Sequence, residues 1–396
     1  MRLKVTPNDF VVTERADLRL AEAGPWAVYR VRKVGCTTLE VQTRLAAQLG
    51  LARRQVIFPA LKDKEAMAVQ FATLPAQAPP HLQGPGFEAQ RVGYRATPLS
   101  PGDLQGNAFE IVVRHLLPFQ AQAFGQALGS LGEWGLPNYF GAQRFGSYAP
   151  EWGFIGKAIL KRDAQAALYA YLARPFLGDP PAVQSFKKQA QAFWPDWAAM
   201  MAVAPKPSNY RSVLTFLKDH PQEYRKALNL IPPRLLSLYL AAYQSYLWNA
   251  IAAHFLGGIY RQAGLPSGTL RIAFATYPLH TAPLGDEWRF LKSLAVPLPS
   301  YRAAFAPEGL AESAGHVLAQ EGLALGDLKA RILKRAYLPR GSRALLAFPT
   351  EVRVEAPQED EHFPGRQAVR VQFTLPSGSY ATVVIQAAMA LALGTR

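Results

Sequence analysis

The chain has 396 residues, of which 49% are hydrophobic and 18% charged, a composition typical of a globular protein with a sizeable core. It carries 43 Lys and Arg against 28 Asp and Glu, a formal net charge of +15, and one cysteine, Cys36. A lone cysteine excludes an intramolecular disulfide framework, no apolar run is long enough to predict a membrane span, and the first residues do not resemble a secretory signal. We therefore expect a cytoplasmic protein whose first partner is a polyanion, nucleic acid ahead of membrane.

The first 115 residues are dominated by segments that alternate between apolar and polar side chains, the pattern of half-buried strands. A helix is predicted over 37–50, where Thr37 and Glu40 form a capping box and Gly50 ends it, and a second over 118–133. The strand-rich order favours a largely antiparallel or mixed sheet with helices on one face. The predicted strands are 8–15, 26–34, 55–61, 67–74, 87–96 and 108–114.

From about residue 150 to 340 the chain changes to long segments rich in Ala, Leu and Arg with proline-rich breaks, which indicate a mainly helical region with some β character near 269–285. Strand alternation returns at 350–356 and 368–375. Strands at both ends around a helical middle predict an α+β fold. We expect one sheet domain formed by residues 1–155 and 345–396, interrupted by an inserted, mainly helical α/β domain of residues 156–344.

Several chemical motifs are absent from the sequence. There is no GxxxxGK[ST] phosphate loop, no HExxH and no cluster of Cys and His, so neither an NTPase nor a zinc enzyme is indicated.

The basic stretch "KARILKRAYLPRGSR" (329–343) contains six cations and no acidic residue. Helical spacing would place Arg331 and Arg335 on one face, and Tyr337 adds a ring that can stack on a base. Alone, this pattern is typical of a solvated helix end. Together with the net charge it favours a surface that faces RNA.

The segment "PNYFGAQRFG" (137–146) combines amides, aromatic rings, an arginine and two glycines. Phe140 or Tyr139 can stack on a nucleobase, Asn138 can bond its edge, and Arg144 can reach a phosphate. The alternative is a glycine-punctuated loop whose rings fill the core, and the residues alone favour that alternative slightly.

The stretch "FPALKDKEAMAVQF" (58–71) places four charged residues between two segments that are both predicted as strands. The alternation of side chains from Ala66 onward marks the second strand, so Asp63 lies just before this strand and at the end of the first. A solvated turn is the ordinary interpretation of such a segment. A catalytic carboxylate held among cations is the other.

Seven segments, in order along the chain, resemble the motifs of the TruD family of RNA pseudouridine synthases. Two positions depart from the family pattern: Ala60 replaces a usual glycine before the Lys-Asp pair, and Ala68 replaces a usual threonine. The matching segments are "LKVTPNDFVVTE" (3–14), "RKVGCTT" (32–38), "LKDKEAMAVQ" (61–70), "LQGNAFEIVVR" (104–114), "NYFGAQRFG" (138–146), "YQSYLWN" (243–249) and "LPSGSYAT" (375–382).

This resemblance implies an isomerase that detaches uracil from C1′ of a uridine, rotates it and rejoins it through C5, without cofactor or metal. It makes Asp63 the essential catalytic residue, as nucleophile or as stabiliser of glycosidic cleavage. Lys4 and Lys62 match basic positions of the family that keep the carboxylate charged or bind phosphate. Because neighbouring strand residues point to opposite faces, Lys62 need not touch Asp63, and Lys4 is the better candidate for the cation beside it.

The resemblance also implies a pseudouridine synthase fold with an inserted domain, and a tRNA substrate whose target uridine is flipped out of the RNA. Phe140 and Tyr380 would abut the extruded uracil, Asn138 would bond its edge, and Arg144 would contact phosphate. The expected target is position 13 in the D arm, and we expect a monomer.

Two other functions fit parts of the sequence. An RNA-binding protein without catalysis would need the basic surface and the aromatic loop but not Asp63. A nucleoside hydrolase or base exchanger would share base flipping, yet such enzymes commonly need a metal or several carboxylates, and the sequence shows neither.

Overall fold

The structure is a computed structural model that describes residues 1–394. The chain divides into two compact units, which we call the sheet unit (Met1–Leu136 together with the chain from Ala347 onward) and the helical unit (Pro137–Leu346). The boundaries between the units fall at residues 136/137 and 346/347. The boundaries expected from the sequence were 155/156 and 344/345.

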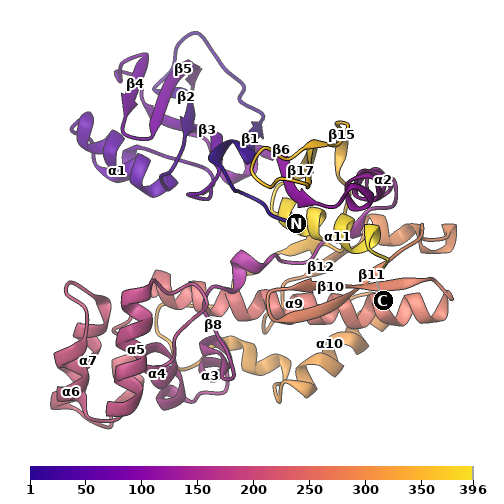
Figure 1. Ribbon diagram of the computed structural model, residues 1–396. Helices are drawn as coiled ribbons and strands as arrows, with labels where there is room; N and C mark the ends of the chain where they lie inside the picture. Colours follow the sequence, from indigo (N-terminus) through magenta and orange to yellow (C-terminus); the bar gives the residue numbers. More distant parts are fainter. Residues whose placement is uncertain (395–396) are drawn as a thin grey trace. The chain divides into compact units, whose positions relative to one another are not determined.

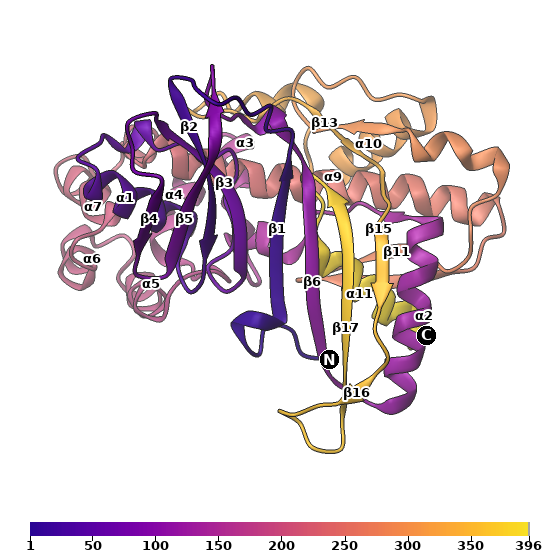
Figure 2. The same ribbon diagram turned by 90° about the horizontal axis from the view of Figure 1, so that it is seen from above.

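The sheet unit is built on one large sheet in the order β15-β17-β6-β1-β3-β2-β5-β4, with β16 paired to β17 (Figure 2). Only β1 and β3 are parallel; the other neighbours are antiparallel. The predicted mixed, largely antiparallel sheet is therefore confirmed. The strands are β1 (Phe10–Ala16), β2 (Trp26–Lys33), β3 (Met67–Pro75), β4 (His81–Gly84), β5 (Phe87–Arg95), β6 (Leu104–Leu116), β15 (Thr350–Val354), β16 (Gln358–Glu359) and β17 (Gln367–Pro376).

Three α-helices cover parts of this sheet. Helix α1 (Thr38–Gln48) begins at Thr37, which accepts a hydrogen bond from the Glu40 amide in the expected capping box, and its apolar side packs on β2 and β3. Helices α2 (Pro118–Trp134) and α11 (Ala381–Ala392) pack against each other, and α2 also lies against β15 and β17. Short 3-10 turns connect the elements: η1 (Pro7–Asp9), η2 (Arg53–Gln55) and η3 (Pro101–Asp103).

The expected strand at 55–61 is wrong. The chain there forms η2 and an irregular segment, and only Ile57 bridges to β3, at Thr73. The side-chain amide of Gln42, on α1, donates to the carbonyl oxygens of Arg53 (3.2 Å) and Val56 (2.7 Å). These carbonyls are therefore satisfied by a side chain instead of by a neighbouring strand.

The helical unit is organised around one long buried helix, α9 (Pro233–Gln262), which contacts α3, α10 and the hairpin of β10 and β11 (Figure 1). Its helices are α3 (Ile155–Leu160), α4 (Ala164–Ala173), α5 (Pro181–Phe193), α6 (Trp197–Val203), α7 (Asn209–Asp219), α8 (Tyr224–Leu228), α9 and α10 (Glu308–Gln320). Two short strands, β7 (Leu136–Pro137) and β14 (Leu346–Ala347), lie where the chain passes from one unit to the other. The remaining strands and 3-10 turns of the helical unit are η4 (Ala142–Phe145), β8 (Tyr148–Ala149), β9 (Gly153–Phe154), β10 (Ser267–Ile272), β11 (Ala275–His280), η5 (Asp286–Lys292), β12 (Ala295–Pro297), η6 (Leu325–Lys329) and β13 (Ser342–Ala344).

The helical spacing expected for Arg331 and Arg335 is also wrong, because residues 330–341 contain no helix. The side chain of Asn229 donates to the carbonyl oxygen of Ile332 (2.9 Å) and accepts from the amide of Lys334 (2.8 Å). A distant side chain thus provides the hydrogen bonds that a helix would have provided.

A buried arginine joins the two sequence-distant parts of the sheet unit. Arg114, on β6, donates to both carboxylate oxygens of Asp9 (2.9 Å each) and to Asp360 (3.1 Å). Asp9 and Asp360 are 1% and 2% exposed, so their charges depend on Arg114. Burial raises the pKa of Asp9, but the bonds from Arg114 and Thr6 outweigh this, so its pKa is below the ordinary value.

We expect Arg114→Met to lower the free energy of unfolding by about 3–5 kcal/mol, because it leaves two buried carboxylates without the cation that pairs with them. The midpoint of urea unfolding measures this loss. Arg370→Met is the matched control, since it removes an exposed pair with Glu110 and should cost less than about 1 kcal/mol. Equal shifts of the two midpoints would contradict the role assigned to Arg114.

Candidate active site

Asp63 lies on the irregular segment that leads into β3, and its side chain is 46% exposed. The Lys4 ammonium donates to its Oδ2 at 3.2 Å and lies 4.8 Å from the centre of the Phe10 ring. Lys4 has the left-handed backbone conformation, with φ of 57°. An accessible carboxylate therefore has one cation beside it.

The side chain of Lys62, the residue before Asp63, bonds to residues other than Asp63. Its ammonium pairs with Glu14 (2.9 Å) and donates to the Asn107 side chain (2.6 Å), and the Lys62 and Glu14 side chains are 8% and 1% exposed. Glu14 also accepts from the Phe71 amide at 2.9 Å. Lys62 is thus a buried anchor between β1 and β6, and its charge is balanced within the protein.

Lys33, which the sequence analysis did not single out, is fully buried at the end of β2. Its ammonium donates to the backbone carbonyl oxygens of Asp63 (2.5 Å) and Cys36 (2.9 Å). Burial lowers the pKa of Lys33. The Asp63 backbone is therefore held in place by a buried lysine.

Thr38, at the start of α1, fixes the same segment from a second side. Its hydroxyl oxygen accepts from the Lys62 amide (2.9 Å) and donates to the Gln70 side chain (3.2 Å). Four of the motifs quoted above, those at 3–14, 32–38, 61–70 and 104–114, thus contact one another around Lys62 and Asp63.

In the helical unit, Asn138 is buried and held by Arg343. The Arg343 guanidinium donates to the Asn138 carbonyl (2.6 Å) and to its side-chain oxygen (2.7 Å), while the Asn138 side-chain nitrogen donates to the Ala344 carbonyl (3.1 Å). Arg343 also lies 4.3 Å from the centre of the Phe140 ring. One cation of the basic stretch therefore orders the loop at 138–146.

Two residues of the 243–249 motif hold the rest of this loop. The Asn249 side chain accepts from the Phe140 amide (2.8 Å) and donates to its carbonyl (3.0 Å). Arg144 donates to the Ser245 hydroxyl at 3.0 Å. Phe140 is 9% exposed and meets the Trp248 ring edge-on, as expected of a loop whose rings fill the core. The contact of this loop with a nucleobase stays a prediction.

Tyr380 belongs to the sheet unit, where it precedes α11 after the turn that ends β17. Asp63, Lys4, Lys62 and Tyr380 are therefore residues of one unit, and Asn138, Phe140 and Arg144 are residues of the other.

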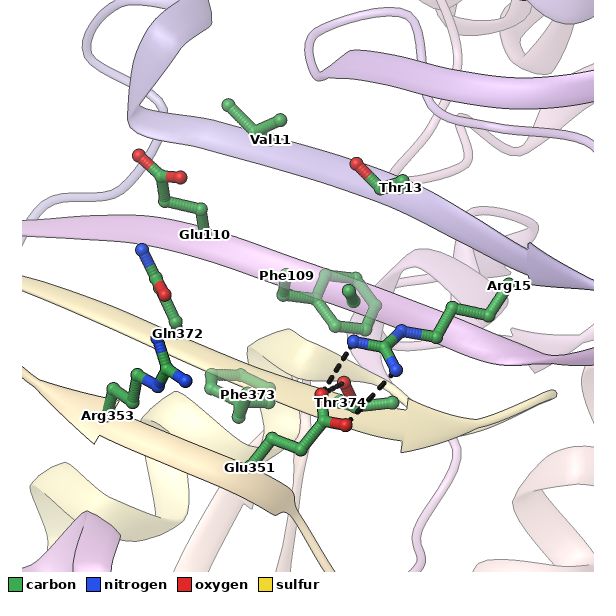
Figure 3. Close-up of a pocket in the computed structure, with 11 residues that line it drawn as sticks. Val11, Thr13, Arg15, Phe109, Glu110, Glu351, Arg353, Gln372, Phe373 and Thr374 are labelled. Atoms are coloured by element: carbon green, nitrogen blue, oxygen red, sulfur yellow. Dashed lines mark hydrogen bonds and ion pairs between the residues drawn. The ribbon is translucent and has the colours of Figure 1, made fainter. Parts of the chain in front are cut away.

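A polar pocket lies on the face of the large sheet opposite to the one that carries Glu14 (Figure 3). Arg15 on β1 forms two hydrogen bonds with Glu351 (3.1 and 2.6 Å), and Thr374 donates to the same carboxylate (3.0 Å). Because Glu14 and Arg15 are neighbours on β1, they point to opposite faces. The pocket is thus separated from Lys62 and Glu14 by the sheet.

Within residues 1–394, no three His, Cys, Asp or Glu side chains gather in a way that could hold a metal ion. In the same range, none of the helices is both long and apolar enough to cross a membrane.

Comparison with solved structures shows that this fold is shared with a crystal structure titled as a putative tRNA pseudouridine synthase D (TruD) from Methanosarcina mazei. The TM-score is 0.72 at 24% identity, over 98% of this chain and 93% of that one. The fold class, an α+β protein with a largely antiparallel sheet, is therefore that of a known structure.

A family model described as tRNA pseudouridine synthase D (TruD) matches residues 1–259 and 288–387, so the chain belongs to this family. Among its relatives, tRNA pseudouridine synthase D of Aquifex aeolicus is 26% identical over 98% of this chain and 97% of its own length. A probable tRNA pseudouridine synthase D of Halobacterium salinarum is 32% identical over 97% of this chain and 92% of its own. Both the family resemblance and the class of enzyme, a pseudouridine-forming isomerase, are confirmed.

Proposed function

We propose that the protein isomerises a uridine of tRNA to pseudouridine, with Asp63 as the catalytic carboxylate and position 13 of the D arm as the target. The observation that carries this proposal is the accessible Asp63 carboxylate, which pairs with Lys4 at 3.2 Å. The backbone of its segment is fixed by hydrogen bonds with the side chains of Lys33 and Thr38. The neighbouring cation, Lys62, is neutralised by Glu14. Lys4 therefore remains as the cation that pairs with Asp63.

The reaction breaks the C1′–N1 bond, rotates the uracil and forms a C1′–C5 bond, while the hydrogen on C5 passes to solvent and N1 gains one. Asp63 would act while the glycosidic bond is broken, as a nucleophile or by stabilising positive charge on the sugar. An isomerisation needs no oxidant, reductant or second substrate, which is consistent with our expectation that no cofactor or metal takes part.

The proposal keeps Tyr380, in the sheet unit, and Asn138, Phe140 and Arg144, in the helical unit, as contacts to the RNA. Asn138 and Phe140 are already ordered by Arg343 and Asn249, so their conformational freedom is small before any RNA binds. This order would offset part of the cost of flipping a base, about a few kcal/mol. We further propose that the enzyme acts as a monomer in the cytoplasm.

Tritium release tests the proposed function. The purified protein is incubated with an unmodified tRNA transcript that carries tritium at C5 of its uridines, and we expect release of about one tritium per target uridine into water. The transcript is then analysed for pseudouridine at position 13. Free uracil in place of pseudouridine would indicate a hydrolase, and tight RNA binding without release would indicate an RNA-binding protein.

A further inference from the structure

Three cations surround the ring of Tyr301 in the helical unit, at a place that no step of the proposed reaction uses. The guanidinium carbons of Arg302 and Arg340 lie 5.2 and 5.7 Å from the ring centre, and the Lys329 ammonium lies 5.7 Å from it. Arg340 also donates to the Tyr301 hydroxyl at 3.2 Å. All three cations are exposed, and the tyrosine is partly buried.

The three cations differ in their ion pairing from other exposed cations of this unit. Within the described part of the chain, Arg302, Lys329 and Arg340 form no ion pair with a carboxylate. Other exposed cations of this unit do, such as Lys226 with Glu223 and Arg289 with Asp286 at 2.6 Å. Like charges held together repel one another, so an anion placed among them would be stabilised.

The segments that carry the cluster are fixed in position. The buried Gln244 side chain, in α9, donates to the carbonyl oxygens of Pro299 (2.9 Å) and Pro339 (2.8 Å). Strands β12 and β13 pair between the same two segments. The cations therefore project from an ordered frame, and binding an anion there requires little ordering of the backbone.

The cluster is close to the loop that holds Phe140. Arg343, whose guanidinium lies 4.3 Å from the Phe140 ring centre, follows Arg340 by three residues. Three residues of extended chain span at most about 10 Å. The Cα atoms of Arg340 and Arg343 are thus at most about 10 Å apart, and we expect a strand of RNA with one nucleotide near Phe140 to pass near Arg340.

We propose that Tyr301, Arg302, Lys329 and Arg340 form a phosphate-binding site that holds the RNA backbone next to the modified nucleotide. This inference rests on the proposed function. Guanidinium groups bind phosphate oxygens with paired hydrogen bonds. Because the cations already lie against the Tyr301 ring, phosphate contact fits the cluster better than base stacking does.

The test compares two triple variants that remove the same charge. Arg302→Gln with Lys329→Gln and Arg340→Gln removes the cluster, and Lys218→Gln with Lys226→Gln and Arg289→Gln removes three exposed cations elsewhere in the same unit. Affinity for the unmodified tRNA transcript is measured by filter binding between about 50 and about 200 mM salt. We expect the cluster variant to bind at least about tenfold more weakly, with a salt slope smaller by about 2 to 3.

Unchanged binding by the cluster variant would overturn the inference, since the RNA would then not contact the cluster. An equal loss in the control variant would also overturn it, since net charge alone would then attract the RNA. Tritium release by the wild type is measured on the same transcript. Absence of release would refute the proposed function, while the comparison of salt slopes would still decide whether the cluster binds phosphate.

Discussion

Asp63→Asn should abolish tritium release, with kcat reduced by more than about 1,000-fold, while the affinity for tRNA stays within about twofold of the wild type. The substitution keeps the size of the side chain, but it replaces one accepting carboxylate oxygen with a donating NH2 group and removes the negative charge. It therefore removes both a nucleophile and a stabiliser of positive charge on the sugar. Because the side chain is 46% exposed, the stability of the fold should change little.

Glu65→Gln is the matched control for this substitution. Glu65 is an exposed carboxylate two residues away on the same segment, so its loss changes the local charge equally. We expect this variant to release tritium at the wild-type rate. Release by the Asp63→Asn protein above about a hundredth of the wild-type rate would move the chemistry to another residue.

The elements of the sheet unit could be predicted because their sequences alternate cleanly. The strand predicted at 67–74 is β3, and the helix predicted at 118–133 is α2, each within a residue of its observed bounds. The strand predicted at 55–61 did not form: only Ile57 bridges to β3, and the Val56 carbonyl accepts from the Gln42 side chain, 14 residues before it in the chain. A local pattern shows which residues are apolar, but it does not show which distant group satisfies the backbone.

The candidate site was predictable only in part for the same reason. The alternation of Lys62 and Asp63 indicated that their side chains would have different partners, and Lys4 could be named through the family resemblance. Lys33 gave no such signal, because a lysine at the end of an alternating strand is ordinarily exposed. Its burial against the Asp63 carbonyl depends on how β2 and β3 pair and on where the segment at 58–66 returns.

Lys33→Met should lower kcat by about 10- to 100-fold, because a shift of the catalytic group by about 1 Å can cost this much. The Lys33 ammonium is bonded to the carbonyl oxygens of Asp63 and Cys36, and methionine fills a similar volume without a donor. The buried Cys36 carbonyl and the partly buried Asp63 carbonyl then lose their partner, which should also lower the free energy of unfolding by about 1–3 kcal/mol. Lys33 acts on the reaction only through Asp63, so we class it as a positioning residue.

A matched substitution separates positioning from stability. Lys187 in α5 is also fully buried, and it pairs with Asp179 at 2.8 Å. Lys187→Met should destabilise the protein at least as much, since it leaves Asp179 without its cation, yet kcat measured below the unfolding transition should match the wild type. If Lys33→Met also kept its kcat under those conditions, Lys33 would only support the fold. A loss of kcat confined to Lys33→Met, with tRNA affinity retained, would show that the position of the Asp63 backbone limits the rate.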